Sequence, residues 1–334
     1  MIKKLLRLFL KKKKDKIYMD KINHQYIIII NPHCHQGKGW DKWLLIKKKV
    51  LESLPVQGFI FVLTPEFSFD TDITPLLTDN KVNIIISAGG DGSVHYIINY
   101  VMGLTDEIRR TISIGAIGLG SSNDFLKPYG QKIDGVPVKF DWTKEPVLSD
   151  VGLVHFVDSN DVIHKKYFII NASLGVTAFA NNNFNHPKEW LKFLKKYSTN
   201  AAILCTAIFS IFSYKNILMK ICFVGRTFIS PVANVNILKI PYVSGSLHYT
   251  VPVRPDDGKL SVNICLNMNK WELLKVLYNL SEGIFKIEKK TMSVSIDNLE
   301  VSSIKPFIFE CDGETETAKK VTFSIIHKVI NILN

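Results

Sequence analysis

The spacing of hydrophobic positions changes near the middle of the chain. Between residues 25 and 126, short apolar runs alternate with stretches in which apolar residues recur every three or four positions. Such alternation predicts a parallel sheet with helices on its faces. The expected strands lie at 26–30, 59–63, 82–86 and 112–117, and the expected helices at 40–54, 71–77 and 94–101.

From about residue 151, strand-like runs separated by polar turns dominate, which predicts a mainly antiparallel β-sandwich or barrel. These runs lie at 167–170, 233–240, 259–266 and 307–310, and two helical insertions are expected at 188–212 and 270–283. The domain boundary is placed in the weakly periodic segment 130–149, which contains two prolines. The pattern therefore predicts a tail (1–24), an α/β domain (25–148) and a β-rich domain (149–334) whose last segment can pack back on the first domain.

The bulk properties fit two soluble domains. The length of 334 residues is about twice that of a common domain. The longest apolar stretch, 201–212, is shorter than the roughly 20 residues that cross a bilayer. Five scattered cysteines without CxxC spacing predict neither a disulfide framework nor a zinc site. We expect a protein of the cytoplasm.

The net charge of +12 is concentrated at the N-terminus. Residues 1–16 hold eight Lys and Arg against one Asp, with Ile2, Leu5, Leu6 and Phe9 at helical spacing. This segment is either a basic amphipathic helix for an anionic membrane or a disordered tail. A signal peptide is disfavoured because Arg7 interrupts the apolar run. The rest of the chain is only mildly basic, which argues against a nucleic-acid partner.

Three glycine-rich loops follow predicted strands: 31–39 (NPHCHQGKG), 87–93 (SAGGDGS) and 118–125 (GLGSSNDF). Ligands of open parallel sheets bind at the carboxyl ends of strands. Glycines permit positive φ and close approach of the backbone, which leaves amide groups free to bind phosphate at a helix N-terminus. Asp91 would repel a bare phosphate, so a divalent cation is expected to accompany it.

These loops resemble the catalytic domain of the diacylglycerol kinase and sphingosine kinase superfamily, through Asn31-Pro32, 89–93 and 120–125. The resemblance continues in 167–178 (YFIINASLGVTA), 255–260 (PDDGKL) and 312–314 (DGE). It implies that ATP binds between the two domains with Mg²⁺ and that a phosphoryl group passes to a lipid hydroxyl.

The resemblance also assigns roles to single residues. It places Asp312 as general base, with Glu314 and Asp91 as the other catalytic residues. The nucleotide site would comprise Asn31, Thr64, Gly89, Gly90, Asp91, Gly92, Ser93, Gly120, Ser121, Asn123 and Asp124. Asp91 and Asp124 would join the Mg²⁺ and its water network. Asp257 would bind a structural metal together with the carbonyls of Arg254 and Lys259. Without the resemblance, Asp312-Gly313 is better explained as a hairpin turn.

The expected function is that of an ATP-dependent lipid kinase associated with the membrane surface, which most simply converts diacylglycerol to phosphatidic acid. A sphingoid base is the alternative acceptor. NAD kinase shares the GGDG turn but is disfavoured by 120–125 and 255–260. Tyr96 stands where the family usually has an acid, which motivates a non-catalytic nucleotide- or lipid-binding protein as the competing class. Asp150 could bind an amine or hydroxyl of the lipid acceptor, but an exposed carboxylate at the domain boundary is the preferred interpretation. The oligomeric state stays open, a homodimer included.

Overall fold

Four parallel strands form the centre of the N-terminal domain in the computed structural model, which describes residues 25–55, 57–79 and 82–334. The strands are β1 (Gln25–Ile30), β2 (Gln57–Val62), β3 (Ile84–Gly89) and β4 (Ser113–Gly118), in the order β2-β1-β3-β4. β1 and β3 are apolar at nearly every position because both faces of the sheet are covered. The predicted basic tail lies outside the described residues.

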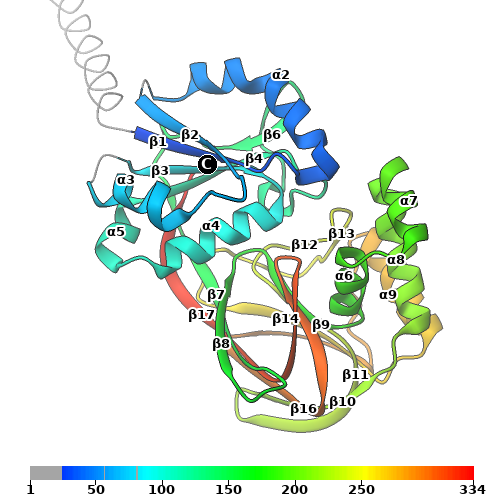
Figure 1. Cartoon of the computed structure of the whole chain (residues 1–334). Coiled ribbons are helices and arrows are strands. Elements are labelled where there is room, and N and C mark those ends of the chain that lie inside the picture. Colours follow the sequence, from blue (N-terminus) through cyan, green and yellow to red (C-terminus); the bar gives the residue numbers. More distant parts are fainter. Residues whose placement is uncertain (1–24, 56, 80–81) are drawn as a thin grey trace, which may run out of the picture.

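Alternate residues of β1 pack against different helices. Ile28 and Ile30 share a core with α2 (Lys38–Ser53), whereas Ile27 and Ile29 share one with α4 (Asp91–Gly103) on the opposite face. Figure 1 shows α2 on one side of the sheet and α3 (Thr74–Thr78), α4 and α5 (Asp106–Thr111) on the other. The helix expected at 71–77 is a π-helical turn, Phe69–Ile73, followed by α3.

The segment predicted to be the domain boundary belongs partly to the first domain. β5 (Gln131–Ile133) and β6 (Val136–Lys139) form a hairpin that pairs with β4. Weak periodicity here reflects two short edge strands and their turn.

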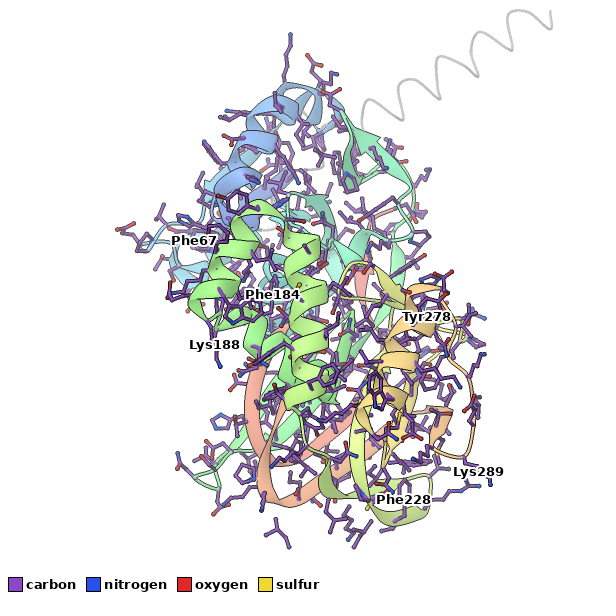
Figure 2. All side chains as sticks on the ribbon, turned by 90° about the vertical axis from the view of Figure 1, so that its right-hand side faces the viewer. Phe67, Phe184, Lys188, Phe228, Tyr278 and Lys289 are labelled. Carbon is purple, nitrogen blue, oxygen red and sulfur yellow. The ribbon has the colours of Figure 1, made fainter. Side chains whose placement is uncertain are left out.

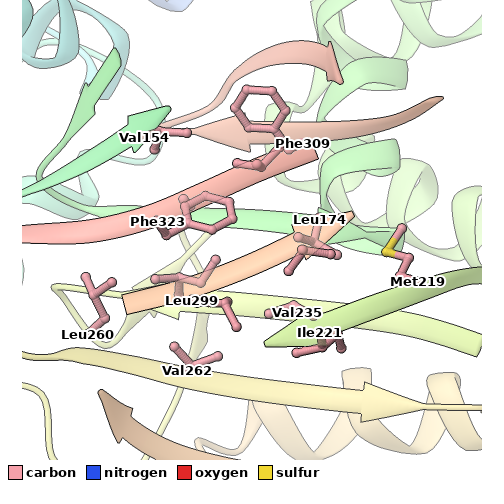
Figure 3. Packing of buried hydrophobic residues seen from close by; sticks show 14 of the residues in the cluster. Val154, Leu174, Met219, Ile221, Val235, Leu260, Val262, Leu299, Phe309 and Phe323 are labelled. Atoms are coloured by element: carbon pink, nitrogen blue, oxygen red, sulfur yellow. The ribbon is translucent and has the colours of Figure 1, made fainter. Parts of the chain in front are cut away.

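The C-terminal domain is built from antiparallel strands around an apolar core. Its strands are β7 (Val147–Val157), β8 (Ile163–Phe168), β9 (Asn171–Gly175), β10 (Ile217–Phe223), β11 (Arg226–Leu238), β14 (Leu260–Leu266), β15 (Thr291–Ile296), β16 (Asn298–Cys311) and β17 (Glu314–Ile332), with a small hairpin of β12 (Tyr242–Val243) and β13 (Leu247–His248). Phe309, Phe323 and Leu174 meet in this core (Figure 3). The predicted fold class, an α/β domain followed by a mainly antiparallel β-rich domain, is confirmed.

Four helices cover one side of the β-rich domain: α6 (Val176–Asn185), α7 (Glu189–Tyr197), α8 (Thr199–Ser213) and α9 (Lys270–Ser281) (Figure 1). The helix expected at 188–212 is therefore two helices. They separate at Ser198, which is extended and whose hydroxyl accepts a hydrogen bond from the Ala201 amide as the N-cap of α8. No helix in the described part of the chain is long and apolar enough to cross a bilayer.

β17 joins the two domains. It runs antiparallel to β7 and β16, and its end pairs with β4 of the first domain through Asn331 and Ile332. The Leu333 amide then donates to the Ile114 carbonyl. The C-terminus consequently lies in the N-terminal domain (Figure 1), and one sheet continues through both. This continuity fixes the glycine loops relative to the β16–β17 turn.

Candidate active site

The topology of the first sheet creates a crevice between β1 and β3. The chain leaves β1 toward β2 on one side and returns to β3 on the other, so the connections diverge at the carboxyl ends of these strands. Asn31 and Ser93 lie there, and Asn31 Nδ2 donates to Ser93 Oγ at 3.1 Å. The first and second glycine loops therefore meet, as their positions after strands predict.

The glycines of the second and third loops serve close approach and not positive φ, whereas Gly37 of the first loop has φ 86°. Gly90 has φ −102°, and Gly89, Gly90 and Gly92 are absent from the positive-φ residues of the described chain. The expectation of positive φ was wrong at these positions. A methyl group at Gly120 would lie 2.5 Å from Gly90 Cα, and one at Gly89 would lie 2.2 Å from Ser93 Oγ. Glycine lets the loops touch and leaves the N-terminus of α4 open to an anion.

Asp91 ties the second loop to the third. Its two carboxyl oxygens accept hydrogen bonds from the amides of Asp124 and Phe125, each at 3.0 Å. Burial, and then the neighbouring carboxylate of Asp124, raise the pKa of Asp91 to about 7. A buried carboxyl whose charge is disfavoured in this way fits a site to which a nucleotide brings its own divalent cation. Among the described residues, no group of three or more His, Cys, Asp or Glu could hold a metal by itself.

Asp124 and Asn123 organise the third loop. Asp124 accepts from Lys127 Nζ at 2.7 Å and from the Gly245 amide of the second domain at 3.1 Å. Asn123 adopts φ 50°, and its side chain bonds the backbone of Gly118 and Gly120. Asn123 therefore shapes the loop from inside.

Asp312 occupies the turn between β16 and β17. Asp312 and Gly313 have φ of 50° and 93°, values typical of a type I′ hairpin turn. The fully buried Asp312 carboxylate accepts hydrogen bonds from three successive amides, at 3.1 Å from Ile169, 2.8 Å from Ile170 and 3.1 Å from Asn171. The hairpin interpretation is therefore confirmed, and the turn brings the Asp312 carboxylate against three backbone donors of a distant segment.

His95 completes this cluster and was not among the predicted residues. It lies one turn after Asp91 in α4, and its Nδ1 is 3.1 Å from Asp312 Oδ2 in a buried contact. Asn99, one turn further, binds both backbone groups of Tyr167 and so holds α4 against β8. The only sequence signal for His95 is its spacing of four residues from Asp91, which places both on one face of the helix.

Glu310 is a second buried carboxyl beneath the turn. It is fully buried, and its Oε2 accepts a hydrogen bond from the Gly313 amide at 2.8 Å. Burial raises the pKa of Glu310 to about 8. The side chain is therefore largely protonated at neutral pH.

We expect Glu310 to make the protein less stable as the pH rises. Its pKa is higher in the folded state, about 8 against 4.5, so its stabilising contribution is lost as the pH rises through this window. Glu310→Gln keeps the hydrogen bond to Gly313 but cannot ionise. Its unfolding free energy should exceed that of the wild type at pH 9 by on the order of 2 kcal/mol, with a smaller difference at pH 7. Urea unfolding at both values measures this. Glu300→Gln on the same strand is the control, and an equal pH dependence in wild type and Glu310→Gln would contradict the assignment.

The predicted metal ligands meet, but around an ammonium group. Lys239 Nζ lies 2.8 Å from the Arg254 carbonyl, 2.8 Å from the Lys259 carbonyl and 3.4 Å from Asp257 Oδ1. It also donates to Asp150 Oδ2 at 3.0 Å. Asp150 is fully buried, so its interpretation as an exposed boundary carboxylate was wrong. Because the Lys239 ammonium group already lies among them, Asp257 and the carbonyls of Arg254 and Lys259 do not fit a divalent cation.

One cavity of about 410 Å³ brings most of the predicted residues together. From the first domain it is lined by Asn31, Gly90, Asp91, Gly92, Ser93, Gly120, Ser121 and Asp124, and from the β16–β17 turn by Asp312 and Glu314. Thr64, Gly89 and Asn123 are described but are not part of this lining. Tyr96, at the position of the family acid, also faces the cavity and is largely exposed.

The other end of the cavity is apolar. Ile203, Ala207 and Ile211 of α8 face Leu273, Val276 and Leu280 of α9 across it. Sequence periodicity predicted helices here, but only packing places their apolar faces on the same cavity as the glycine loops. The site therefore combines glycine loops at the N-terminus of α4, a buried carboxylate and an apolar compartment.

Comparison with known proteins assigns both domains. Residues 25–139 match the model of the diacylglycerol kinase catalytic domain, and residues 171–334 match that of the YegS C-terminal NAD kinase beta sandwich-like domain. The chain belongs to the diacylglycerol kinase superfamily. No curated protein sequence matches it significantly.

Solved structures share the fold at low sequence identity. A diacylglycerol kinase from Bacillus anthracis str. Sterne is 15% identical, with a TM-score of 0.64 over 93% of this chain and 96% of that chain. A second structure from the same organism is 18% identical, with a TM-score of 0.67 over 93% and 95%. A third is 16% identical, with a TM-score of 0.65 over 93% and 97%. Membership of this kinase superfamily implies a phosphotransferase that uses ATP.

Proposed function

We propose that the protein transfers the γ-phosphoryl group of ATP to the hydroxyl of a membrane lipid, with diacylglycerol as the acceptor and phosphatidic acid as the product. The observation that carries this proposal is the single cavity that places the glycine loops, Asp312 and an apolar compartment side by side. The glycine loops suit the phosphates of a nucleotide, Asp312 suits a hydroxyl acceptor, and the apolar compartment suits acyl chains.

We assign phosphate binding and proton transfer to different residues of the cavity. The amides at the N-terminus of α4 and the hydroxyls of Ser93 and Ser121 would bind the phosphates. Asp312 would accept the proton of the lipid hydroxyl as its oxygen attacks the γ-phosphorus and the bond to the ADP oxygen breaks. The hydrogen bonds from the amides of Ile169, Ile170 and Asn171 would hold the Asp312 carboxylate in position for this proton transfer.

Mg²⁺ would be held near Asp91 with the nucleotide and would supply charge neutralisation at the phosphates. Asp91 fits this role because its carboxylate lies beside Asp124 and has no Lys or Arg partner within the described part of the chain. Asp124 already has Lys127 as its partner at 2.7 Å.

Incubation of the purified protein with radiolabelled ATP, Mg²⁺ and vesicles carrying diacylglycerol, ceramide or sphingosine tests the proposal. We expect label in diacylglycerol, and we expect the Asp91→Asn variant to lose it while the exposed control Asp161→Asn keeps it. Label in sphingosine alone would show that the acceptor is a sphingoid base and not diacylglycerol. ATP binding without label in any lipid would instead support a non-catalytic binding protein.

Filling the apolar end should select against long acyl chains. Ala207→Phe places a ring where the inner face of α8 borders the cavity. We expect kcat/KM for a dioleoyl acceptor to fall by about 10-fold or more, with a smaller loss for a dioctanoyl acceptor, because acyl groups and the ring compete for the same volume. Leu218→Phe, at an exposed position of β10 that does not line the cavity, is the control. Equal losses for both acceptors would place the acyl chains elsewhere.

A further inference from the structure

The outer surface of the helical layer carries large apolar side chains that face solvent. We define this surface as the aromatic face, formed by Trp190, Phe193 and Tyr197 of α7, Leu204 and Phe212 of α8, and Trp271 of α9. Phe193 is 65% exposed, Phe212 52% and Trp271 75%. Figure 2 turns this side of the molecule toward the viewer, with α7 and α8 in front. Exposed apolar patches of this kind mark interaction sites.

The aromatic face is continuous across the three helices. Trp190 packs against Phe209 of α8 with ring centroids 5.9 Å apart, and Phe212 packs against Trp271 of α9 at 6.4 Å. Phe193 and Tyr197 lie 4.7 Å apart on α7. These contacts make one surface of side chains that belong to separate segments of the sequence.

α8 is apolar on both sides. Its 15 residues, TNAAILCTAIFSIFS, include no charged side chain. Ile203, Ala207 and Ile211 point to the cavity, whereas Leu204 and Phe212 are exposed. A helix without a polar face is stable only where both sides are covered, and the described residues cover only the inner one.

The charges beside the aromatic face fit an anionic partner. Residues 188–197 contain four lysines and one glutamate. Lys188 Nζ lies 5.5 Å from the ring centroid of Phe209, and the exposed Lys192 pairs with Glu189 at 2.7 Å. The segment as a whole keeps a net positive charge beside the apolar side chains. Tryptophan, tyrosine and lysine around an apolar centre are typical of surfaces that sit in the headgroup region of a bilayer. An isologous contact with a second copy would bring these lysines together and is disfavoured.

We propose that the aromatic face docks on an anionic bilayer and brings the apolar end of the cavity to the membrane. The proposal rests on the proposed function, because only a lipid acceptor requires the cavity to meet a bilayer. α8 is then the wall between membrane and cavity, and its two apolar sides serve two apolar environments.

Tryptophan fluorescence with vesicles of phosphatidylglycerol and phosphatidylcholine brominated in the acyl chains tests the docking directly. Residues 1–24 contain no tryptophan, so binding through the basic tail alone produces no quenching from that segment. We expect quenching in the full chain that falls at least twofold in Trp190→Phe/Trp271→Phe and persists in the control Trp40→Phe. Vesicle binding without quenching, or equal quenching in the double variant, would overturn the proposal.

An activity pair separates this proposal from the proposed function. Phe193→Ser/Phe212→Ser should lose about 10-fold or more in phosphorylation of vesicle-embedded diacylglycerol while keeping activity on a dispersed short-chain acceptor. Ile163→Ser/Ile304→Ser, which changes exposed residues of β8 and β16, should change neither. Quenching in a wild type that phosphorylates no lipid would remove the proposed function but keep the docking surface. Full vesicle activity in the Phe193→Ser/Phe212→Ser variant, or a dimer that this variant dissociates, would overturn the docking surface.

An independent observation concerns the ammonium group of Lys239. It is buried, and its three protons match three acceptors at 2.8 to 3.0 Å: the carbonyls of Arg254 and Lys259 and the carboxylate of Asp150. Asp150 in turn accepts from the amides of Gly258 and Lys328. The backbone amide of Lys239 donates to Ile170, whose own amide binds Asp312.

We infer that Lys239 is a covalently attached substitute for a structural cation. It supplies positive charge at the turn 255–260 and connects that turn to β7, to β17 and to the segment that holds Asp312. Stability of this region should then be independent of free divalent cations.

Thermal unfolding without nucleotide tests this inference. We expect the wild-type melting temperature to stay within about 1 °C between EDTA and 5 mM MgCl₂ or CaCl₂, because the ammonium is always present. Lys239→Ala should melt several degrees lower and regain part of the loss when Mg²⁺ or Ca²⁺ enters the vacated acceptors. A wild-type protein that holds stoichiometric metal after gel filtration, lost in Asp257→Asn, would overturn the inference. That measurement does not depend on whether Lys239→Ala folds.

Discussion

Asp312→Asn is expected to lower kcat for lipid phosphorylation by about 10²- to 10⁴-fold, the range that general-base catalysis contributes. The asparagine Oδ1 can still accept hydrogen bonds from the amides of Ile169, Ile170 and Asn171, which in the wild type lie 3.3, 2.8 and 3.1 Å from Asp312 Oδ1, so the turn should keep its shape. It cannot accept the proton of the attacking hydroxyl. The binding of ATP should change little, because the glycine loops that would hold the phosphates are on other segments. Single-turnover phosphorylation and nucleotide titration measure the two quantities separately.

The control for this variant is Glu316→Gln. Glu316 lies on the same hairpin and pairs with Lys166. It should retain near wild-type activity. An Asp312→Asn variant that keeps lipid phosphorylation within threefold of the wild type would show that another group accepts the proton. His95, 3.1 Å from Asp312, would be the first candidate for that group.

Gly120→Ala is expected to separate the second and third glycine loops. The added methyl group would lie 2.5 Å from Gly90 Cα and 2.9 Å from Asn123 Oδ1. The first neighbour is backbone and cannot rotate away, so one of the loops must move. Overpacking of this kind costs about 1–3 kcal/mol, and both loops also line the cavity where we propose that the nucleotide binds. We expect a lower melting temperature and an ATP affinity reduced by about 10-fold or more, measured by thermal unfolding and calorimetric titration.

Gly103→Ala provides the comparison at a site with space. Nothing lies within 4 Å of a methyl group at Gly103, the last residue of α4, and its φ is negative. This substitution should be neutral or should stabilise the protein by a few tenths of a kcal/mol through the unfolded state. If Gly103→Ala and Gly120→Ala behave alike, the close contact between the loops does not control nucleotide binding.

Local patterns in the sequence predict the helices and strands and their order along the chain. The apolar runs at β1, β3 and β4 predicted parallel strands because a strand that is buried on both faces is apolar at nearly every position. The glycine loops were found because a turn at a strand end needs residues that permit close approach. Errors fell where two short elements share one pattern, as at Ser198, whose extended backbone divides the expected helix into α7 and α8.

Asp312 shows where local information stops. The dipeptide Asp312-Gly313 determines a hairpin turn by its own chemistry, since both residues tolerate positive φ. The three amides and His95 that surround its carboxylate come from β8–β9 and α4, and His95 is 217 residues away in sequence. No periodicity relates such positions. Only the continuous sheet through β17 brings them together.

The sequence by itself therefore determined the alternation of elements, the fold class and the loops that meet at the crevice, because these depend on periodicity and turn chemistry within a few residues. The tertiary structure decided which side chains are buried and which charged groups are paired. Burial raises the pKa of Glu310, so this carboxyl is largely protonated at neutral pH. The ammonium group of Lys239 lies among the acceptors of Asp150, Arg254 and Lys259. One apolar side of α8 lines the cavity and the other is exposed. Burial and ionic partners depend on packing between distant segments, and that packing is set by the whole chain.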